Sequence, residues 1–190
     1  MENTVRTNHT AGLQELKREV QITQKKGLPF IMASVVIWSL ILLLQFWDKP
    51  MITINFYTFM CSALLMPLAA LSAKIVKADI FRKSSNPISR LGLICTFNQM
   101  LYLVIVMWAF SQKPEAMLMC YAVVFGAHLL PYGWVYDSKA YMVISIADTI
   151  AATVIFVVWG NAAVAVFMAA AQLVLCLLIV SENRKVRTGV

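Results

Sequence analysis

Six long apolar segments constrain this chain more than any other feature of its sequence. Each is about as long as the 20 or so residues that a helix needs to cross the hydrocarbon core of a bilayer. They cover residues 28–46, 52–72, 91–110, 116–136, 141–159 and 162–180. Hydrophobic residues make up 61% of the 190-residue chain, against about 45–50% in soluble domains. The sequence therefore predicts an all-α, polytopic membrane protein with six transmembrane helices in one domain, and it excludes a soluble globular fold.

The Lys and Arg residues are distributed unevenly between the ends of these segments. If the N-terminus is inside, 14 of the 16 Lys and Arg lie in inside segments, and only Lys49 and Lys113 lie outside. The inside segments are then residues 1–27, 73–90, 137–140 and 181–190. Short loops rich in Lys and Arg stay on the cytoplasmic side, so we expect both termini in the cytoplasm. The net charge of +7 is thus interpreted as a topology signal rather than a nucleic-acid surface, and the basic face is expected to attract anionic lipid headgroups.

The two ends of the chain are polar and are expected to lie outside the membrane core. Within residues 1–27, Leu13, Leu16 and Val20 recur at helical spacing with charged residues between them. This pattern predicts a short amphipathic helix on the cytoplasmic surface, the alternative being a solvated tail whose periodicity is accidental. Residues 181–190 are expected to form a basic cytoplasmic tail.

One acid and one histidine stand out within the apolar segments. Asp148 is the only carboxylate in any segment, and His128 is the only histidine there. A carboxylate at a helix centre costs about 2.5–3.5 kcal/mol on insertion scales, so it normally faces the bundle interior and has a partner or a task. Both residues lie ten positions from the turn around Ser138, and they therefore sit at the same depth. A contact between them is geometrically permitted, although it depends on the rotation of each helix about its axis.

Other polar side chains are expected at a similar depth. Asn98 and Gln99 lie eight and nine residues into the third segment, and Gln172 is about nine residues from the inner end of the sixth. Tyr102 and Tyr132 extend this polar layer by one turn each along their helices. The alternative is that these groups only hold helices together, since interhelical hydrogen bonds contribute about 0.6–2 kcal/mol each.

Two prolines are expected to break the helices that contain them. Pro131 cannot donate to the Ala127 carbonyl, and Pro67 cannot donate to the Ala63 carbonyl. Free backbone carbonyls at membrane depth are tolerated where helices pack or line a cavity, and transporters use them in binding sites. No catalytic residue is assigned, and one histidine with one carboxylate falls short of the ligands that zinc needs. We therefore expect neither a metal site nor a cofactor.

Three stretches of sequence resemble a known family. They are residues 25–30, Pro67 followed by residues 72–74, and above all the stretch from Gly126 to Tyr141. Together they resemble an uncharacterised family of small bacterial integral membrane proteins, classed as a domain of unknown function. The resemblance implies a single six-helix domain in the bacterial cytoplasmic membrane, and it supplies no reaction. His128, Pro131 and Tyr132 match the family pattern, whereas Asp148 lies outside it.

Three functions remain open from the sequence. The first is a small permease or channel-like protein in which the polar layer binds a cation, a proton or a small polar solute. The second is a noncatalytic accessory or sensor subunit of a membrane complex. The third is an intramembrane enzyme acting on a lipid, with His128 as general base. Because six spans in 190 residues are few for a complete transporter, a homodimer is expected.

Overall fold

The computed structural model describes the backbone of residues 2–80 and 84–188 and the side chains of residues 12–80 and 84–186. All regular structure in these residues is helical. The α-helices are α1 (Glu2–Thr23), α2 (Leu28–Leu44), α3 (Met51–Ala63), α4 (Leu65–Val76), α5 (Pro87–Gln112), α6 (Met117–His128), α7 (Leu130–Val135), α8 (Lys139–Trp159) and α9 (Asn161–Thr188), with 3₁₀ turns at Lys25–Gly27 and Pro114–Ala116.

Six helical stretches of the described residues are long and apolar enough to cross a membrane, which confirms the predicted fold class. They are Lys25–Leu44, Met51–Val76, Pro87–Gln112, Pro114–Val135, Lys139–Trp159 and Asn161–Val186. Several run beyond the apolar segments because a helix continues into polar residues wherever its backbone hydrogen bonds can be completed. The protein is accordingly an integral membrane protein built from one helical bundle.

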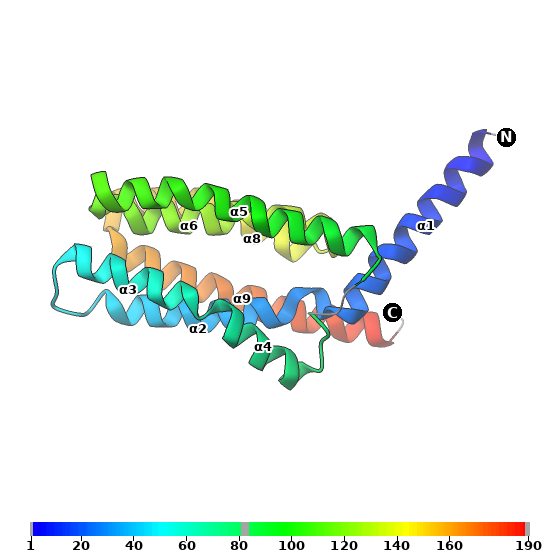
Figure 1. Ribbon diagram of the computed structural model, residues 1–190, viewed down its shortest axis with the longest axis horizontal. Helices are drawn as coiled ribbons and strands as arrows, with labels where there is room; N and C mark the ends of the chain where they lie inside the picture. Colours follow the sequence, from blue (N-terminus) through cyan, green and yellow to red (C-terminus); the bar gives the residue numbers. More distant parts are fainter. Residues whose placement is uncertain (1, 81–83, 189–190) are drawn as a thin grey trace.

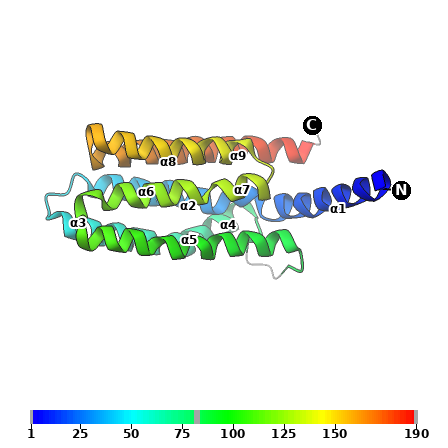
Figure 2. The same ribbon diagram turned by 90° about the horizontal axis from the view of Figure 1, so that it is seen from above.

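The spans pack side by side in two layers (Figures 1 and 2). One layer contains α3/α4, α2 and α9, and the other contains α5, α6/α7 and α8. Helix α8 packs against α9 and so connects the layers along one side. Between the layers, the fully buried Trp38 ring of α2 contacts Tyr121 and Phe125 of α6 at centroid distances of 5.5 and 5.7 Å. This aromatic contact between the middle helices of the two layers is part of the buried core.

Two of the spans are discontinuous near a proline. The span from Met51 to Val76 is divided at Leu64, three residues before Pro67, and the span that ends at Val135 is divided at Leu129, two residues before Pro131. A proline is well accommodated in the first turn of a helix, where its missing N–H would have no partner. The helix is therefore interrupted just upstream of each proline rather than at the ring itself.

Both ends of the chain lie at the same end of the bundle (Figure 1). Helix α1 projects from that end, and its 22 residues make it longer than the short helix that the sequence predicted. Helix α9 continues to Thr188, so residues 181–188 form helix rather than the expected tail. Glu182 and Asn183 explain this, because they bond to the side chain of Lys26 and the carbonyl of Lys25. The basic side chains of Arg6, Arg82, Lys83 and Arg187 lie outside the described residues.

Candidate functional site

Asp148 lies near the middle of the 21-residue helix α8, and none of its surface is exposed. Its Oδ2 atom accepts a hydrogen bond of 2.8 Å from Nε2 of Gln172 on α9, and Gln172 is equally buried. Carboxylates are rarely buried completely unless they are paired or have a role. The acid that the sequence singled out is therefore held inside the bundle by an amide.

The hydrogen bonds continue from Gln172 to a third helix. Oε1 of Gln172 accepts a bond of 3.2 Å from the hydroxyl of Ser34 on α2, and that hydroxyl also lies 2.8 Å from the carbonyl oxygen of Ile31. Ser34 and Gln172 belong to one layer of the bundle, and Asp148 belongs to the other. The network of Ser34, Gln172 and Asp148, hereafter the polar network, thus joins the two layers.

Two polar atoms in this part of the core have no hydrogen-bond partner in the described part of the chain. They are Oδ1 of Asp148 and Nε1 of Trp38, and both are buried. Trp38 follows Ser34 by one turn on α2. An unsatisfied buried polar group costs about 1–3 kcal/mol, and more when it is charged. Protonation of Asp148 would remove the charge from this unpartnered oxygen, and a cation at Oδ1 would supply the missing partner.

Gly126 allows α6 to pack closely against α8 beside Asp148. A Cβ atom at Gly126 would lie 2.8 Å from Cβ of Asp148 and 3.0 Å from the backbone nitrogen of Thr149. The carbonyl oxygen of Gly126 also accepts a bond of 2.8 Å from the Ser145 hydroxyl, one turn before Asp148 on α8. Glycine is therefore required here by contact, and it fixes how α6 lies against the acid.

His128 does not bond to Asp148 in the structure. Its Nδ1 atom contacts the carbonyl oxygen of Phe125 in its own helix, and its ring packs edge-on against Phe125 and Tyr132 at centroid distances of 5.1 and 5.9 Å. Since Gly126 faces Asp148, a residue two positions later points about 200° away around the helix. The shared depth of His128 and Asp148 therefore does not produce a contact.

The remaining predicted residues are dispersed. Gln99 is buried on α5, whereas Asn98 and Tyr102 lie on exposed parts of that helix. The Tyr132 hydroxyl lies 2.6 Å from Thr96 Oγ1 and donates to the Gly92 carbonyl at 3.1 Å, so it joins α7 to α5. Pro67 and Pro131 are exposed. Of the predicted polar layer, the structure thus brings Asp148 and Gln172 together.

The stretch from Gly126 to Tyr141 has a second role at the end of the bundle where both chain termini lie, because it anchors α1, the turn that follows α1, and α9. Four of its side chains contact those segments. The ammonium group of Lys17 lies 3.7 Å from the Trp134 ring centroid, Tyr136 donates to Gln24 (2.9 Å), Ser138 donates to Glu182 (3.0 Å), and Tyr141 donates to the Lys26 carbonyl (2.8 Å). Lys26 also pairs with Glu182 at 2.8 Å. These contacts, hereafter the terminal cluster, use the hydroxyl and aromatic groups in which this motif is rich.

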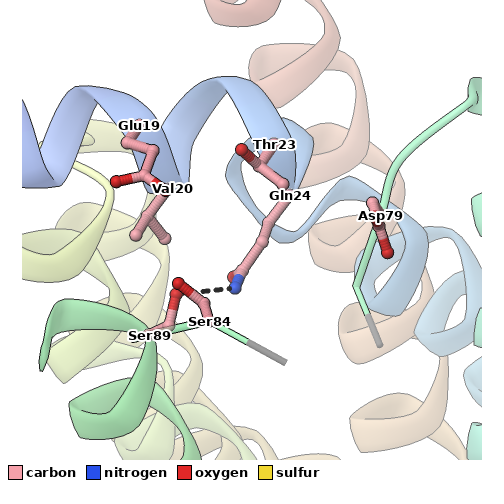
Figure 3. A pocket seen from close by; sticks show the side chains of 7 residues that line it. All are labelled: Glu19, Val20, Thr23, Gln24, Asp79, Ser84 and Ser89. Atoms are coloured by element: carbon pink, nitrogen blue, oxygen red, sulfur yellow. Dashed lines mark hydrogen bonds between the residues drawn. The ribbon is translucent and has the colours of Figure 1, made fainter. Parts of the chain in front are cut away.

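A small pocket opens beside this cluster, between the end of α1 and the start of α5 (Figure 3). It is lined by Glu19, Val20, Thr23, Gln24, Asp79, Ser84 and Ser89. Its volume is about 10 Å³, which is the space for roughly one water molecule. The pocket is therefore too small for an organic solute.

Sequence reasoning did not find Ser34, Trp38, Gly126 or Ser145 as parts of this site. Serine is common in transmembrane helices, where its hydroxyl usually bonds to its own backbone, as Ser34 also does with Ile31. Trp38 resembles any core aromatic residue. The one available signal was Gly126, since a glycine inside a helical pattern often marks close packing.

Comparison with known proteins identifies one family. The sequence model of a family of unknown function, DUF7010, matches residues 13–182, which is most of the chain. No curated protein matches the chain, and no solved structure matches it.

Proposed function

The chain belongs to the DUF7010 family of unknown function, and we propose that it is a small permease that uses Asp148 to bind a proton or a monovalent cation. The observation that carries the proposal is Oδ1 of Asp148, a fully buried carboxylate oxygen without a hydrogen-bond partner in the described residues. Ionisable residues inside membrane spans commonly mark ion pathways and proton relays. A carboxylate used only to hold helices together would gain from having both oxygens bonded.

The polar network accommodates both protonation states of Asp148. In the ionised state, Asp148 Oδ2 accepts from the Gln172 amide nitrogen. In the protonated state, a 180° turn of the amide lets Asp148 donate to Gln172 Oε1, and the amide nitrogen then donates to Ser34. The Ser34 hydroxyl then donates its one hydrogen to the Ile31 carbonyl oxygen, which lies 2.8 Å away. Apart from this turn of the amide, Asp148 therefore binds and releases a proton without any change in the positions of the side chains around it.

The position of the network between the two layers suits alternating access. In many transporters the ion site lies near the bilayer midplane, where two groups of helices rock against each other. Asp148 belongs to one layer, and its partners Gln172 and Ser34 belong to the other. The discontinuities at Leu64 and Leu129 place one bendable span in each layer. The described conformation is closed around Asp148, since neither Asp148 nor Gln172 is exposed.

The permease lies in the bacterial cytoplasmic membrane with both termini inside. The described Lys and Arg residues support this orientation, because Lys49 and Lys113 lie at the end of the bundle opposite the chain termini, while the others lie at the end that holds the termini. This end is cytoplasmic under the positive-inside rule. It also binds anionic lipid headgroups, since exposed cations near the surface contribute about 1 kcal/mol each.

The test is ion movement in proteoliposomes that contain the pH dye pyranine. Pulses of Na⁺ or K⁺, or a potential set with valinomycin, are expected to change the internal pH in wild-type vesicles. The change is expected to be at least tenfold slower with Asp148→Asn, which keeps the shape of the side chain but cannot exchange a proton. Asp48→Asn is the matched control, because Asp48 is exposed between α2 and α3, and it should behave as wild type.

A second readout does not depend on flux. Dicyclohexylcarbodiimide modifies protonated carboxyl groups in apolar surroundings, and mass spectrometry is expected to find it on Asp148, with less labelling at high pH or high Na⁺. Equal ion movement in wild type and Asp148→Asn would overturn the proposal. So would an absence of both ion movement and labelling, because Asp148 would then be a sealed structural group.

A second candidate function is that of an accessory or sensor subunit. It is favoured by α1, which projects beyond the bundle and could present a surface to a partner (Figure 1). In that case Asp148→Asn changes no flux, and the protein copurifies with another membrane protein from its native membrane.

A further inference from the structure

Helix α5 presents an exposed face along most of its length. Six residues on this face follow one another at alternating intervals of three and four, and all of them are exposed. They are Leu91, Ile94, Asn98, Leu101, Ile105 and Trp108, hereafter the α5 seam. These intervals average 3.4 residues, close to the period of about 3.5 residues at which two helices pack lengthwise with a left-handed crossing.

Asn98 distinguishes the α5 seam from an ordinary lipid-facing surface. It is the twelfth of the 26 residues of α5, so it lies about 2 Å from the helix midpoint at 1.5 Å per residue. Within the described part of the chain its amide makes no hydrogen bond, and its side chain is exposed. Hydrocarbon offers no partner to such a group. Something other than lipid must cover Asn98.

We infer that the α5 seam is a homodimer interface in which Asn98 bonds to Asn98 of a second copy. An amide both donates and accepts, so it is complementary to itself across a two-fold axis. A single polar residue in an otherwise apolar heptad face fixes the register of two identical helices, and transmembrane helices associate through such interhelical amides. The inference goes beyond the proposed permease function, because it concerns a helix that contributes nothing to the polar network.

The exposed face of α8 shows what a lipid-facing surface in this protein looks like. Val143, Ile146, Ile150, Val154 and Val157 are all apolar and all more than half exposed. The exposed polar residue near them, Thr153, donates to the carbonyl of Thr149 in its own helix at 3.3 Å. These side chains of α8 leave no polar group without a partner when they face lipid. The exposed face of α8 therefore provides a matched control for α5.

The first test is cysteine cross-linking in membranes. The four native cysteines lie in transmembrane spans and are replaced by alanine, after which Leu101→Cys or Ile150→Cys is introduced. Because both positions are strongly exposed, at 71% and 62%, random collision would oxidise them equally. Leu101→Cys is expected to form disulfide-linked dimers at least fivefold more than Ile150→Cys. Equal cross-linking at the two positions would overturn the inference.

The second test measures the role of the amide itself. Donor- and acceptor-labelled copies are mixed in liposomes, and energy transfer is followed as lipid dilutes the protein. Asn98→Leu is expected to raise the dissociation constant about 3- to 30-fold, the effect of one interhelical hydrogen bond. Thr153→Leu, the same kind of change on α8, is expected to leave it unchanged. A monomeric wild type, or an Asn98→Leu variant that dimerises as well as wild type, contradicts the inference.

Discussion

The polar network in the middle of the bundle and the terminal cluster both contain a buried or partly buried carboxylate, but they pair it differently. In the terminal cluster, Glu182 uses both carboxylate oxygens, one with Lys26 and the other with Ser138. In the polar network, Asp148 uses one oxygen with Gln172 and leaves the other without a partner. Glu182 is still a quarter exposed, whereas Asp148 is fully buried.

This difference is what the proposed roles predict, with the terminal cluster contributing to stability and the polar network to the proposed permease function. A carboxylate at the edge of the membrane can be ionised and fully paired at little cost. A carboxylate at the middle is costly, and leaving one oxygen free adds to that cost. Retaining such a group lowers the stability of the protein. Under the proposed function, the group is retained because it binds a proton or a cation reversibly.

Removing the ion pair of the terminal cluster should give the largest loss of stability. Lys26→Ala leaves the largely buried Glu182 without its cation, and we expect a loss of about 3 kcal/mol, seen as a lower melting temperature in detergent. Lys25→Ala is the control, because Lys25 has the same left-handed backbone (both φ 50°) and makes no ion pair in the described residues. It should change stability by no more than about 0.5 kcal/mol.

Asp148→Asn tests the other region of this comparison, the polar network, where we expect no loss of stability. Its melting temperature should equal or exceed that of wild type, because a neutral amide is easier to bury than a carboxylate and still accepts from Gln172. A loss as large as that of Lys26→Ala would mean that Asp148 is structural, and it would remove the distinction between the two regions.

Gly126→Ala tests the close contact that supports the polar network. The added methyl group would overlap Cβ of Asp148 at 2.8 Å, and overpacking of this kind costs about 1–3 kcal/mol. Gly92→Ala on α5 is the matched change, since its Cβ would meet only a Tyr132 ring atom at 3.8 Å. Melting temperatures should fall for Gly126→Ala and should stay level or rise slightly for Gly92→Ala. Equal effects would show that α6 and α8 are free to separate.

The smallest expected loss of stability is at the base of α1. Trp134→Leu removes the ring over which Lys17 lies at 3.7 Å, and we expect a loss of about 1 kcal/mol. Trp47→Leu removes a ring that lies 5.8 Å from the exposed Lys49, and its effect on the melting temperature should be barely measurable. Equal losses from the two variants would indicate that Trp134 contributes through packing rather than through its contact with Lys17.

Much of the fold could be predicted because it depends on quantities that add along the chain. Six spans follow from the length and hydropathy of six segments, and the discontinuities at Leu64 and Leu129 follow from Pro67 and Pro131. The length of α9 was underestimated, because its last turns depend on Glu182 meeting Lys26, a residue 156 positions away. Hydropathy contains no information about such a contact.

The candidate site was only half accessible from sequence. Depth in the membrane can be counted, and counting placed Asp148 and Gln172 at one level, where a hydrogen bond joins their side chains. Rotation cannot be counted, since each residue turns a helix by about 100°. For this reason His128 shares the depth of Asp148 but contacts Phe125, and Asn98 points away from the bundle while its neighbour Gln99 is buried.

The sequence by itself determined that this chain has six segments long and apolar enough to cross a membrane, and that one carboxylate lies inside those apolar segments. The number of spans follows from the length of the apolar segments, and the importance of the carboxylate follows from the cost of burying a charge. Neither depends on how the helices pack. Only the tertiary structure decided which groups that carboxylate meets. Close packing at Gly126 sets the rotation of α6 and α8, and that rotation gives Asp148 the amide of Gln172 and leaves its second oxygen free.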